Sequence, residues 1–217
     1  NIGGTGRLPM ADLVKLCEEA GFKKVKTYIA SGNAIFTSPK SAKQVESVLE
    51  QKVEEYFGKP VPVMVRTVAE LETALKASPF HEMPGNKAAI CFLDAPPPED
   101  LFAGARHQTN EEAVAGKREI YLYYPDGAGQ SKFVLPAARK GTARNMNTIN
   151  KLVELASALD TPQWEKSQHE SLRSLWRARI TLFHEGAPGA AGETPAANAS
   201  RPCARNGPGW TRRPKRR

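Results

Sequence analysis

The order of apolar and polar positions in the first sixty residues predicts alternating helices and strands. A helix that begins at Pro9 and ends at Gly21 is indicated by apolar residues at helical spacing. These residues are Leu13, Leu16, Cys17 and Ala20. Two β-rich runs follow at 25–30 and 34–37, separated by Ser31-Gly32-Asn33, which predicts a hairpin.

A second helix and a third strand follow this hairpin. Ser41 and Gln44 have capping-box spacing, an apolar stripe continues to Tyr56, and Gly58 ends the pattern. The run 61–66 predicts a strand. The order α-β-β-α-β becomes the ferredoxin-like β-α-β-β-α-β when one strand is placed in front. The sequence begins with Asn1 and not with Met, so we expect an N-terminal truncation. We expect the central strand of that sheet to be missing and the chain to fold poorly.

The second half predicts another α+β layer. Thr67 and Glu70 form a second capping box, and a helix is predicted to about residue 77. Strands are predicted at 88–94 and 119–124, with helical pieces at 99–115, a short helix at 131–139 and an amphipathic helix at 149–159. The chain is therefore α+β, with a ferredoxin-like half at 1–66 and a second half at 67–160. An extra helix is expected within 161–185, and a disordered tail at 186–217.

Most of the positive charge lies in this tail. The formal net charge is +8, and residues 186–217 hold seven basic residues against the single acid Glu193. The remainder of the chain is therefore nearly neutral. The tail either binds nucleic acid non-specifically or is a solvated end. The residues that would contact phosphate are Arg212, Arg213, Lys215, Arg216 and Arg217.

Several classes of protein are disfavoured by composition. The three cysteines are widely spaced, which argues against a disulfide scaffold and fits a reducing, cytoplasmic location. The four histidines show no spacing typical of metal ligands. No apolar run is long enough to span a bilayer, so no membrane partner is expected. We expect no cofactor and no metal.

Three segments have the chemistry of an anion site. The loop 1–7 contains Gly3, Gly4 and Arg7 ahead of a helix N-terminus, where free N–H groups favour anions. The alternative is a glycine-containing connection without a ligand. Ser31, Gly32 and Asn33 either present a hydroxyl and an amide to a ligand or serve only as a hairpin turn.

The third segment, 141–148, is the most suggestive. It places Arg144, Asn145, Asn147 and Thr148 directly before a helix. The alternative is that Asn147 or Thr148 caps this helix while Arg144 forms a structural salt bridge. Tyr121, Tyr123 and Tyr124 either stack on nucleic-acid bases or pack in the core.

Four motifs in this order resemble the DUF1697 family, bacterial proteins of unknown function. They are NIGGTGRLPMADL, GFKKVKTYIASGNAIF, IYLYYPDGAGQSK and GTARNMNTINKL, so the resemblance covers roughly residues 1–159. Members usually begin with a strand that ends in an Arg-Gly-Ile-Asn-Val-Gly-Gly-like segment, of which only Asn1–Gly4 remains here. Met146 also stands where the family usually has Trp. The resemblance implies a fold and little chemistry.

The function expected from the residues is binding of a small anionic, phosphorylated ligand in a cleft. The site would combine the loop 1–7, the Ser31–Asn33 turn and the Arg144–Thr148 segment. Two alternatives remain open: an enzyme using the same cleft, and a nucleic-acid-binding module acting through the tail. An enzyme needs an acid or base near the cleft, and the sequence identifies no catalytic residue.

Overall fold

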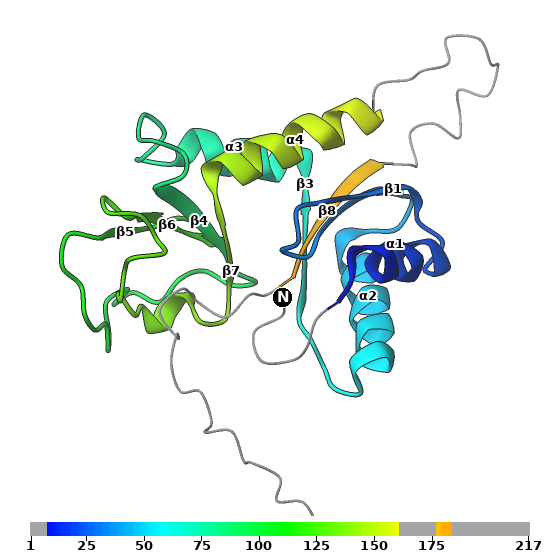
Figure 1. Ribbon diagram of the computed structural model, residues 1–217, viewed down its shortest axis with the longest axis horizontal. Coiled ribbons are helices and arrows are strands. Elements are labelled where there is room, and N and C mark those ends of the chain that lie inside the picture. Colours follow the sequence, from blue (N-terminus) through cyan, green and yellow to red (C-terminus); the bar gives the residue numbers. More distant parts are fainter. Residues whose placement is uncertain (1–7, 161–176, 184–217) are drawn as a thin grey trace, which may run out of the picture.

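The computed structural model describes residues 8–160 and 177–183, which form a mixed α and β fold. This described part contains four α-helices and two four-stranded antiparallel sheets (Figure 1). The first sheet has the strand order β1-β2-β8-β3 and the second has the order β5-β6-β4-β7. The α+β prediction is therefore confirmed.

The first sheet is built mainly from the N-terminal third of the chain. The α-β-β-α-β order predicted there is observed. Its elements are α1 (Met10–Glu19), β1 (Lys23–Tyr28), β2 (Asn33–Ser38), α2 (Ala42–Phe57) and β3 (Val63–Thr67). The strand order is compatible with a ferredoxin-like arrangement.

The central position of this sheet is occupied by a strand from much later in the chain. Strand β8 (Arg177–Phe183) lies between β2 and β3 and pairs antiparallel with both. The helix expected within 161–185 is therefore wrong at 177–183, and residues 161–176 lie outside the described residues. The expectation that this sheet lacks its central strand is also wrong. Strands β2 and β3 each have backbone N–H and C=O groups that need hydrogen-bond partners, and pairing with both strands outweighs the weak helical spacing of 177–183. The β-branched residues of this segment also suit a strand.

Both faces of the first sheet are buried. On one face, side chains of β2 and β3 pack against α1 and α2 in a cluster that includes Phe22, Phe36 and Leu49. On the other face, Ile180 and Leu182 of β8 pack with Ile149 and Leu152 of α4 (Met146–Asp160). A strand covered on both faces has no polar face, which explains why all six residues of β2 are buried.

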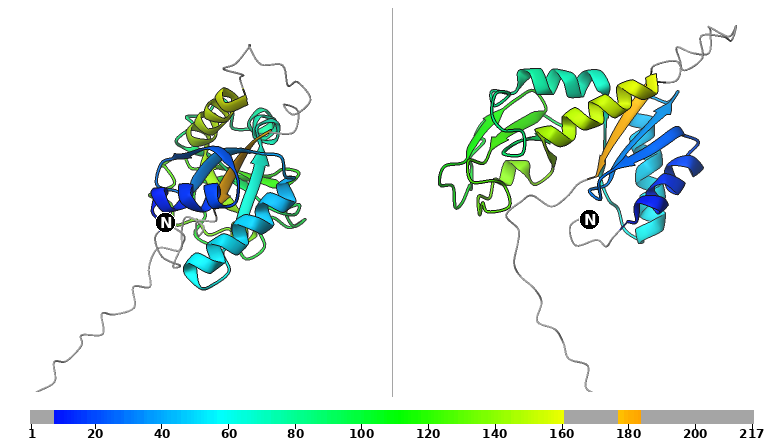
Figure 2. Two further views of the ribbon diagram at one scale, coloured as in Figure 1. Left: turned by 90° about the vertical axis from the view of Figure 1, so that its right-hand side faces the viewer. Right: turned by 45° about the horizontal axis from the view of Figure 1, so that its top comes forward.

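The second sheet lies beside the first, and two helices connect the layers. Helix α4 contacts β2 and β8 of the first sheet and β4 and β7 of the second (Figure 2). Helix α3 (Val68–Ala77) packs against α4 and also contacts β3 and β8. The strands of the second sheet are β4 (Ala88–Phe92), β5 (Glu112–Ala115), β6 (Glu119–Tyr123) and β7 (Thr142–Asn145).

Two expected helices in the second half are not formed. Residues 99–111 run through turns and irregular chain, and 112–115 form β5, so the helical pieces predicted at 99–115 are wrong. In 131–139 only Pro136–Ala138 form a single 3-10 turn. Gly104 interrupts the helical pattern within 99–115, and Pro136, which lacks a backbone N–H, interrupts it within 131–139.

Helix ends agree closely with the sequence. Ser41 accepts the N–H of Gln44, whose side chain accepts the N–H of Ser41 (3.3 and 3.0 Å). Thr67 and Glu70 form the equivalent reciprocal pair at the start of α3. Gly58 ends α2 with φ +69°, as expected for a left-handed C-terminal residue.

Candidate functional site

Two of the three segments predicted to form an anion site meet in the structure. Arg144 on β7 donates from Nε to Oδ1 of Asn33 (2.7 Å) and from Nη2 to the carbonyl of Ser31 (2.7 Å). These residues are more than 110 positions apart in sequence. Gly3, Gly4 and Arg7 lie outside the described residues, so their place relative to Arg144 stays a prediction.

The hydrogen bonds of Arg144 favour a structural role. Besides the two bonds to the β1–β2 turn, Nη1 donates to Oγ1 of Thr142 (2.9 Å) and to the carbonyl of Ala143 (2.8 Å). These bonds use four of the five N–H groups of a guanidinium. The side chain is only 4% exposed. Arg144 therefore ties the first sheet to the second and has little hydrogen-bonding capacity left for a ligand.

The turn that Arg144 contacts differs in one detail from the predicted hairpin. Asn33 is the first residue of β2, opposite Tyr28, and does not supply a left-handed conformation. The positive φ angles belong to Ile29 (+50°) and Gly32 (+74°). The Asn33 amide donates to the Tyr28 carbonyl (3.1 Å) and to the Ser31 hydroxyl (2.7 Å), so it closes the turn from inside.

The residues after Arg144 form the start of α4. Oδ1 of Asn145 accepts the N–H of Thr148 (2.8 Å), so the capping residue is Asn145 and not Asn147 or Thr148. Asn147 packs on Gly85, where an added Cβ would lie 2.2 Å from its Oδ1. Thr148 is buried. This arrangement explains the concentration of polar residues without requiring a ligand.

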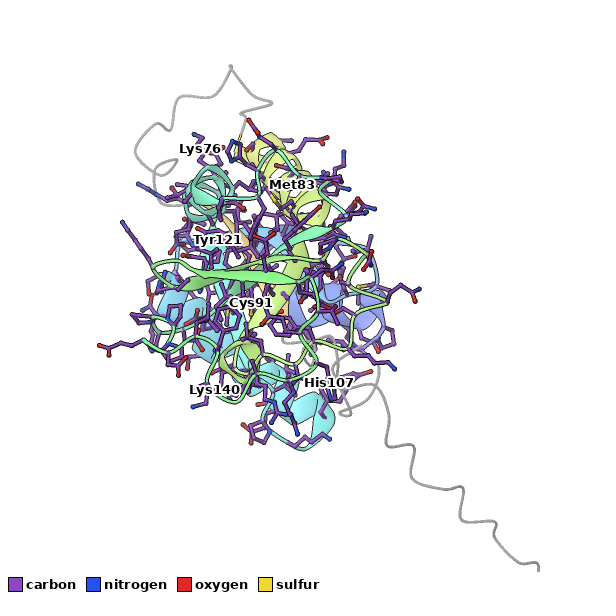
Figure 3. All side chains as sticks on the ribbon, turned by 90° about the vertical axis from the view of Figure 1, so that its left-hand side faces the viewer. Lys76, Met83, Cys91, His107, Tyr121 and Lys140 are labelled. Atoms are coloured by element: carbon purple, nitrogen blue, oxygen red, sulfur yellow. The ribbon has the colours of Figure 1, made fainter. Side chains whose placement is uncertain are left out.

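A cavity of about 630 Å³ opens elsewhere, between α3 and the β5–β6 hairpin. Its floor is Tyr121 of β6, which lies below the helix that carries Lys76 (Figure 3). One wall is the face of α3 and the other is β5 with the hairpin turn. The lining residues are mostly small or apolar, with charged groups at one end: Ala69, Glu70, Thr73, Ala74, Ala77, Pro79, Val114, Ala115, Gly116, Lys117, Arg118, Glu119 and Tyr121. We call this cavity the α3–β5 groove.

An ion pair lies at the charged end of the groove. Nη2 of Arg118 is 2.8 Å from Oε1 of Glu70, and both side chains are about two-fifths exposed. Oε2 of Glu70 accepts the N–H (2.8 Å) and the hydroxyl (2.9 Å) of Thr67. Partial burial by itself raises the pKa of Glu70, but the bonds from Thr67 and the charges of Arg66 and Arg118 outweigh it and lower this pKa. Glu70 is therefore an ionised, hydrogen-bonded group.

The same end of the groove retains unused hydrogen-bond donors. Among the described residues the Arg118 guanidinium makes only its bond to Glu70, which leaves four of its five N–H groups. Lys117 is exposed beside it in the hairpin turn. The first turn of α3, whose N–H groups favour negative charge, forms the adjoining wall through Ala69. The groove therefore offers donors to a ligand that carries acceptors.

Gly116 allows the chain to pass closely over the floor of the groove. A Cβ at this position would lie 2.9 Å from Cε2 of Tyr121 and 3.2 Å from the Glu119 carbonyl oxygen. Gly116 donates its N–H to that carbonyl (2.7 Å) and closes the hairpin. Glu70 is predicted from the sequence as a helix cap and Tyr121 as a strand aromatic, but no sequence pattern predicted a role for Arg118. The only signal for it was the Gly-Lys-Arg run at the start of an alternating strand.

The remaining candidate groups are used in packing. Tyr121 and Tyr124 are buried, and Tyr123 stacks on Phe80 at 5.6 Å, which favours the core interpretation over base stacking. Burial raises the pKa of the Cys17 and Cys91 thiols to about 12, so neither is an activated nucleophile. Within residues 8–160 and 177–183 no group of three His, Cys, Asp or Glu could hold a metal ion. No helix in those residues is long and apolar enough to cross a membrane.

The carboxylate of Glu111 holds a loop of the second sheet in place by hydrogen bonds, and its lowered pKa predicts how the stability of the protein depends on pH. Its carboxylate accepts the N–H (2.7 Å) and hydroxyl (3.1 Å) of Thr109 and the hydroxyl of Ser131. Burial by itself raises the pKa of Glu111, but these hydrogen bonds outweigh it and lower the pKa to about 2. The stabilisation is complete above the unfolded-state pKa of about 4.3 and is lost as the pH falls through about 2.

We therefore expect Glu111→Gln to lower the free energy of unfolding at pH 7 by about 1–3 kcal/mol. The deficit should shrink as the pH falls from about 4.3 toward 2, because the wild-type carboxylate then becomes protonated. Urea unfolding at several pH values checks this, with the exposed neighbour Glu112→Gln as the control. A constant difference between wild type and variant across that range would contradict the role given to the carboxylate.

Comparison with known proteins gives a family and a fold. The family model described as "Protein of unknown function (DUF1697)" matches residues 1–121. A solved structure of a conserved bacterial protein from Streptococcus pneumoniae is similar with a TM-score of 0.51 and 20% sequence identity. The match covers 70% of this chain and 91% of that chain, and at this identity it shows the fold alone. No curated protein matches the chain.

Proposed function

Starting from the fact that this chain belongs to the DUF1697 family of proteins of unknown function, we propose that it binds a small organic ligand with an anionic group. The ligand lies in the α3–β5 groove, with its apolar part on Tyr121 and its anion against Arg118 and Lys117. The observation that carries the proposal is the set of unused N–H groups of Arg118 at the end of an otherwise apolar cavity.

The dimensions and lining of the groove support this ligand class. Its volume of about 630 Å³ falls within the range of small-molecule sites, which are mostly apolar with a few placed polar groups. At the charged end both carboxylate oxygens of Glu70 accept hydrogen bonds and Oε2 of Glu119 accepts the backbone N–H of Arg118, whereas the Arg118 guanidinium has N–H groups to spare. A carboxylate or phosphate supplies the acceptors that this end requires.

The groove supports binding more strongly than acid–base catalysis. A general acid or base needs a pKa near the working pH, whereas the pKa of Glu70 is held below its ordinary value. Glu70 is therefore poorly suited to act as a general acid or base at neutral pH, and the alternative of an enzyme stays a prediction without a named catalytic residue. Nucleic-acid binding through Arg212, Arg213, Lys215, Arg216 and Arg217 stays a prediction, because these residues lie outside the described residues. A cytoplasmic location also stays an expectation.

The test uses a probe with the proposed chemistry. We expect 8-anilinonaphthalene-1-sulfonate to bind the folded protein, with fluorescence enhancement, and its uncharged analogue N-phenyl-1-naphthylamine to bind about tenfold more weakly. Arg118→Ala should weaken the sulfonate to the level of the uncharged analogue. Thr73→Trp, which fills the groove from α3, should abolish binding of both.

Two variants control this experiment. Lys76→Trp adds the same ring to an exposed position of α3 that does not line the groove, and Arg139→Ala removes an exposed charge from another surface. Both should bind the probe like wild type. Equal binding by Thr73→Trp and wild type would show that the probe lies elsewhere, and the proposed site would then be rejected.

A further inference from the structure

The groove is open along one side to the edge of the second sheet. Strand β5 is the outermost strand, with β6 as its only described neighbour in the sheet (Figure 1). Val114, at the centre of β5, is 42% exposed and lines the groove opposite Tyr121. An edge strand presents backbone donors and acceptors to any extended chain that lies beside it.

The register identifies which amides of β5 face outward. Gly116 donates to the Glu119 carbonyl and lies opposite it, so 116 and 119 form a hydrogen-bonded pair. Such pairs alternate along an antiparallel ladder, which makes 114 and 121 the next one. The N–H and C=O groups of Ala113 and Ala115 therefore point to the open edge.

The groove has the length of a short extended segment. It follows α3 from Ala69 to Ala77, or about 12 Å at 1.5 Å per residue. About four residues of a strand cover this distance at roughly 3.3 Å each. Alternate side chains of that strand would enter the groove between Val114 and the α3 face formed by Ala69, Thr73 and Ala77.

The unused N–H groups of Arg118 lie at one end of the α3–β5 groove. Strand β5 runs toward the Gly116–Arg118 turn, where Arg118 and Lys117 are placed. A strand that ends at this turn therefore runs parallel to β5, and its terminal carboxylate reaches Arg118. Edge-strand addition combined with capture of a terminal carboxylate is a known mode of peptide recognition.

We infer that the ligand of the α3–β5 groove is the free C-terminus of an extended peptide, added to the sheet beside β5. This inference rests on the proposed function and narrows it from a small anionic molecule to one chemical class. The terminal carboxylate accepts from Arg118, the peptide backbone pairs with the outward groups of Ala113 and Ala115, and small apolar side chains at alternate positions fill the groove.

The experiment compares two peptide libraries with randomised last four residues, one ending in free carboxylates and the other in carboxamides. We expect binders only from the carboxylate library, with apolar residues recurring at alternate positions. The amide of the best binder and the Arg118→Ala protein should each weaken binding at least about tenfold, as measured by fluorescence polarisation.

Ala113→Pro separates this inference from the proposed function. Proline removes an outward N–H of the edge strand that takes no part in the β5–β6 ladder, and Ala113 is not among the residues that line the groove. The variant should lose the peptide and keep the naphthalenesulfonate probe. If the probe binds but no carboxylate peptide does, or the amides bind equally, the peptide inference is wrong and small-molecule binding stands. If Thr73→Trp leaves probe binding unchanged, the proposed function itself fails.

Discussion

Ile180→Pro should remove most of the stability of this protein, because it breaks the central strand of the first sheet. Ile180 is fully buried and lies opposite Ile35 on β2 and Arg66 on β3. Strands β2 and β3 do not pair with each other, so β8 is the described link between them. Proline removes a ladder hydrogen bond and a buried side chain, at a combined cost of more than about 5 kcal/mol. Net stabilities are about 5–15 kcal/mol, so a large part of the variant should be unfolded.

Circular dichroism with urea or heat measures this effect, and Thr181→Val is the matched control on the same strand. The Thr181 hydroxyl is fully buried and has no hydrogen-bond partner among the described residues. Its replacement should leave the free energy of unfolding unchanged or raise it by roughly 1 kcal/mol. A cooperative transition of wild-type stability in Ile180→Pro would show that the first sheet does not depend on β8.

Arg144→Ala should have the next largest effect. The truncation removes the donors for Oδ1 of Asn33, the hydroxyl of Thr142 and the carbonyl of Ser31. Acceptors left unsatisfied in the interior cost about 1–3 kcal/mol each, and breaking the whole network should cost about 3–5 kcal/mol. Arg144→Lys should recover only part of this loss, because an ammonium cannot reproduce the planar fork that contacts both segments.

Measuring ligand binding as well as the free energy of unfolding tests whether Arg144 ties the sheets together or binds a ligand. Arg139→Ala removes an exposed arginine of the same region and should change the free energy of unfolding by less than about 0.5 kcal/mol. Chemical denaturation and probe binding should be measured on the same samples. If Arg144→Ala kept wild-type stability but abolished binding of an anionic ligand, Arg144 would be a ligand residue and not a tie between the sheets.

The sequence alone determined the local elements and their ends. Both capping boxes, at Ser41 and Thr67, involve residues three positions apart, so their chemistry is complete within one helical turn. The α-β-β-α-β order of the first sheet and the final amphipathic helix follow from the spacing of apolar residues in the same way. The basic tail is also a property of sequence, and it lies outside the described residues.

Only the tertiary structure decided how distant segments combine. The apolar residues before and within 177–183 suggest a helix when considered locally, but the open position between β2 and β3 makes 177–183 a strand. Arg144 has the positive charge and the N–H groups expected of an anion-binding residue. In the folded protein, however, four of these N–H groups bond to the β1–β2 turn and to β7. Arg118 has no distinctive local pattern, and the fold places it at the end of a groove beside α3. The residue type specifies how many hydrogen bonds each side chain can donate or accept. Whether those donors and acceptors bond within the protein or stay available to a ligand depends on which partners the fold brings within reach.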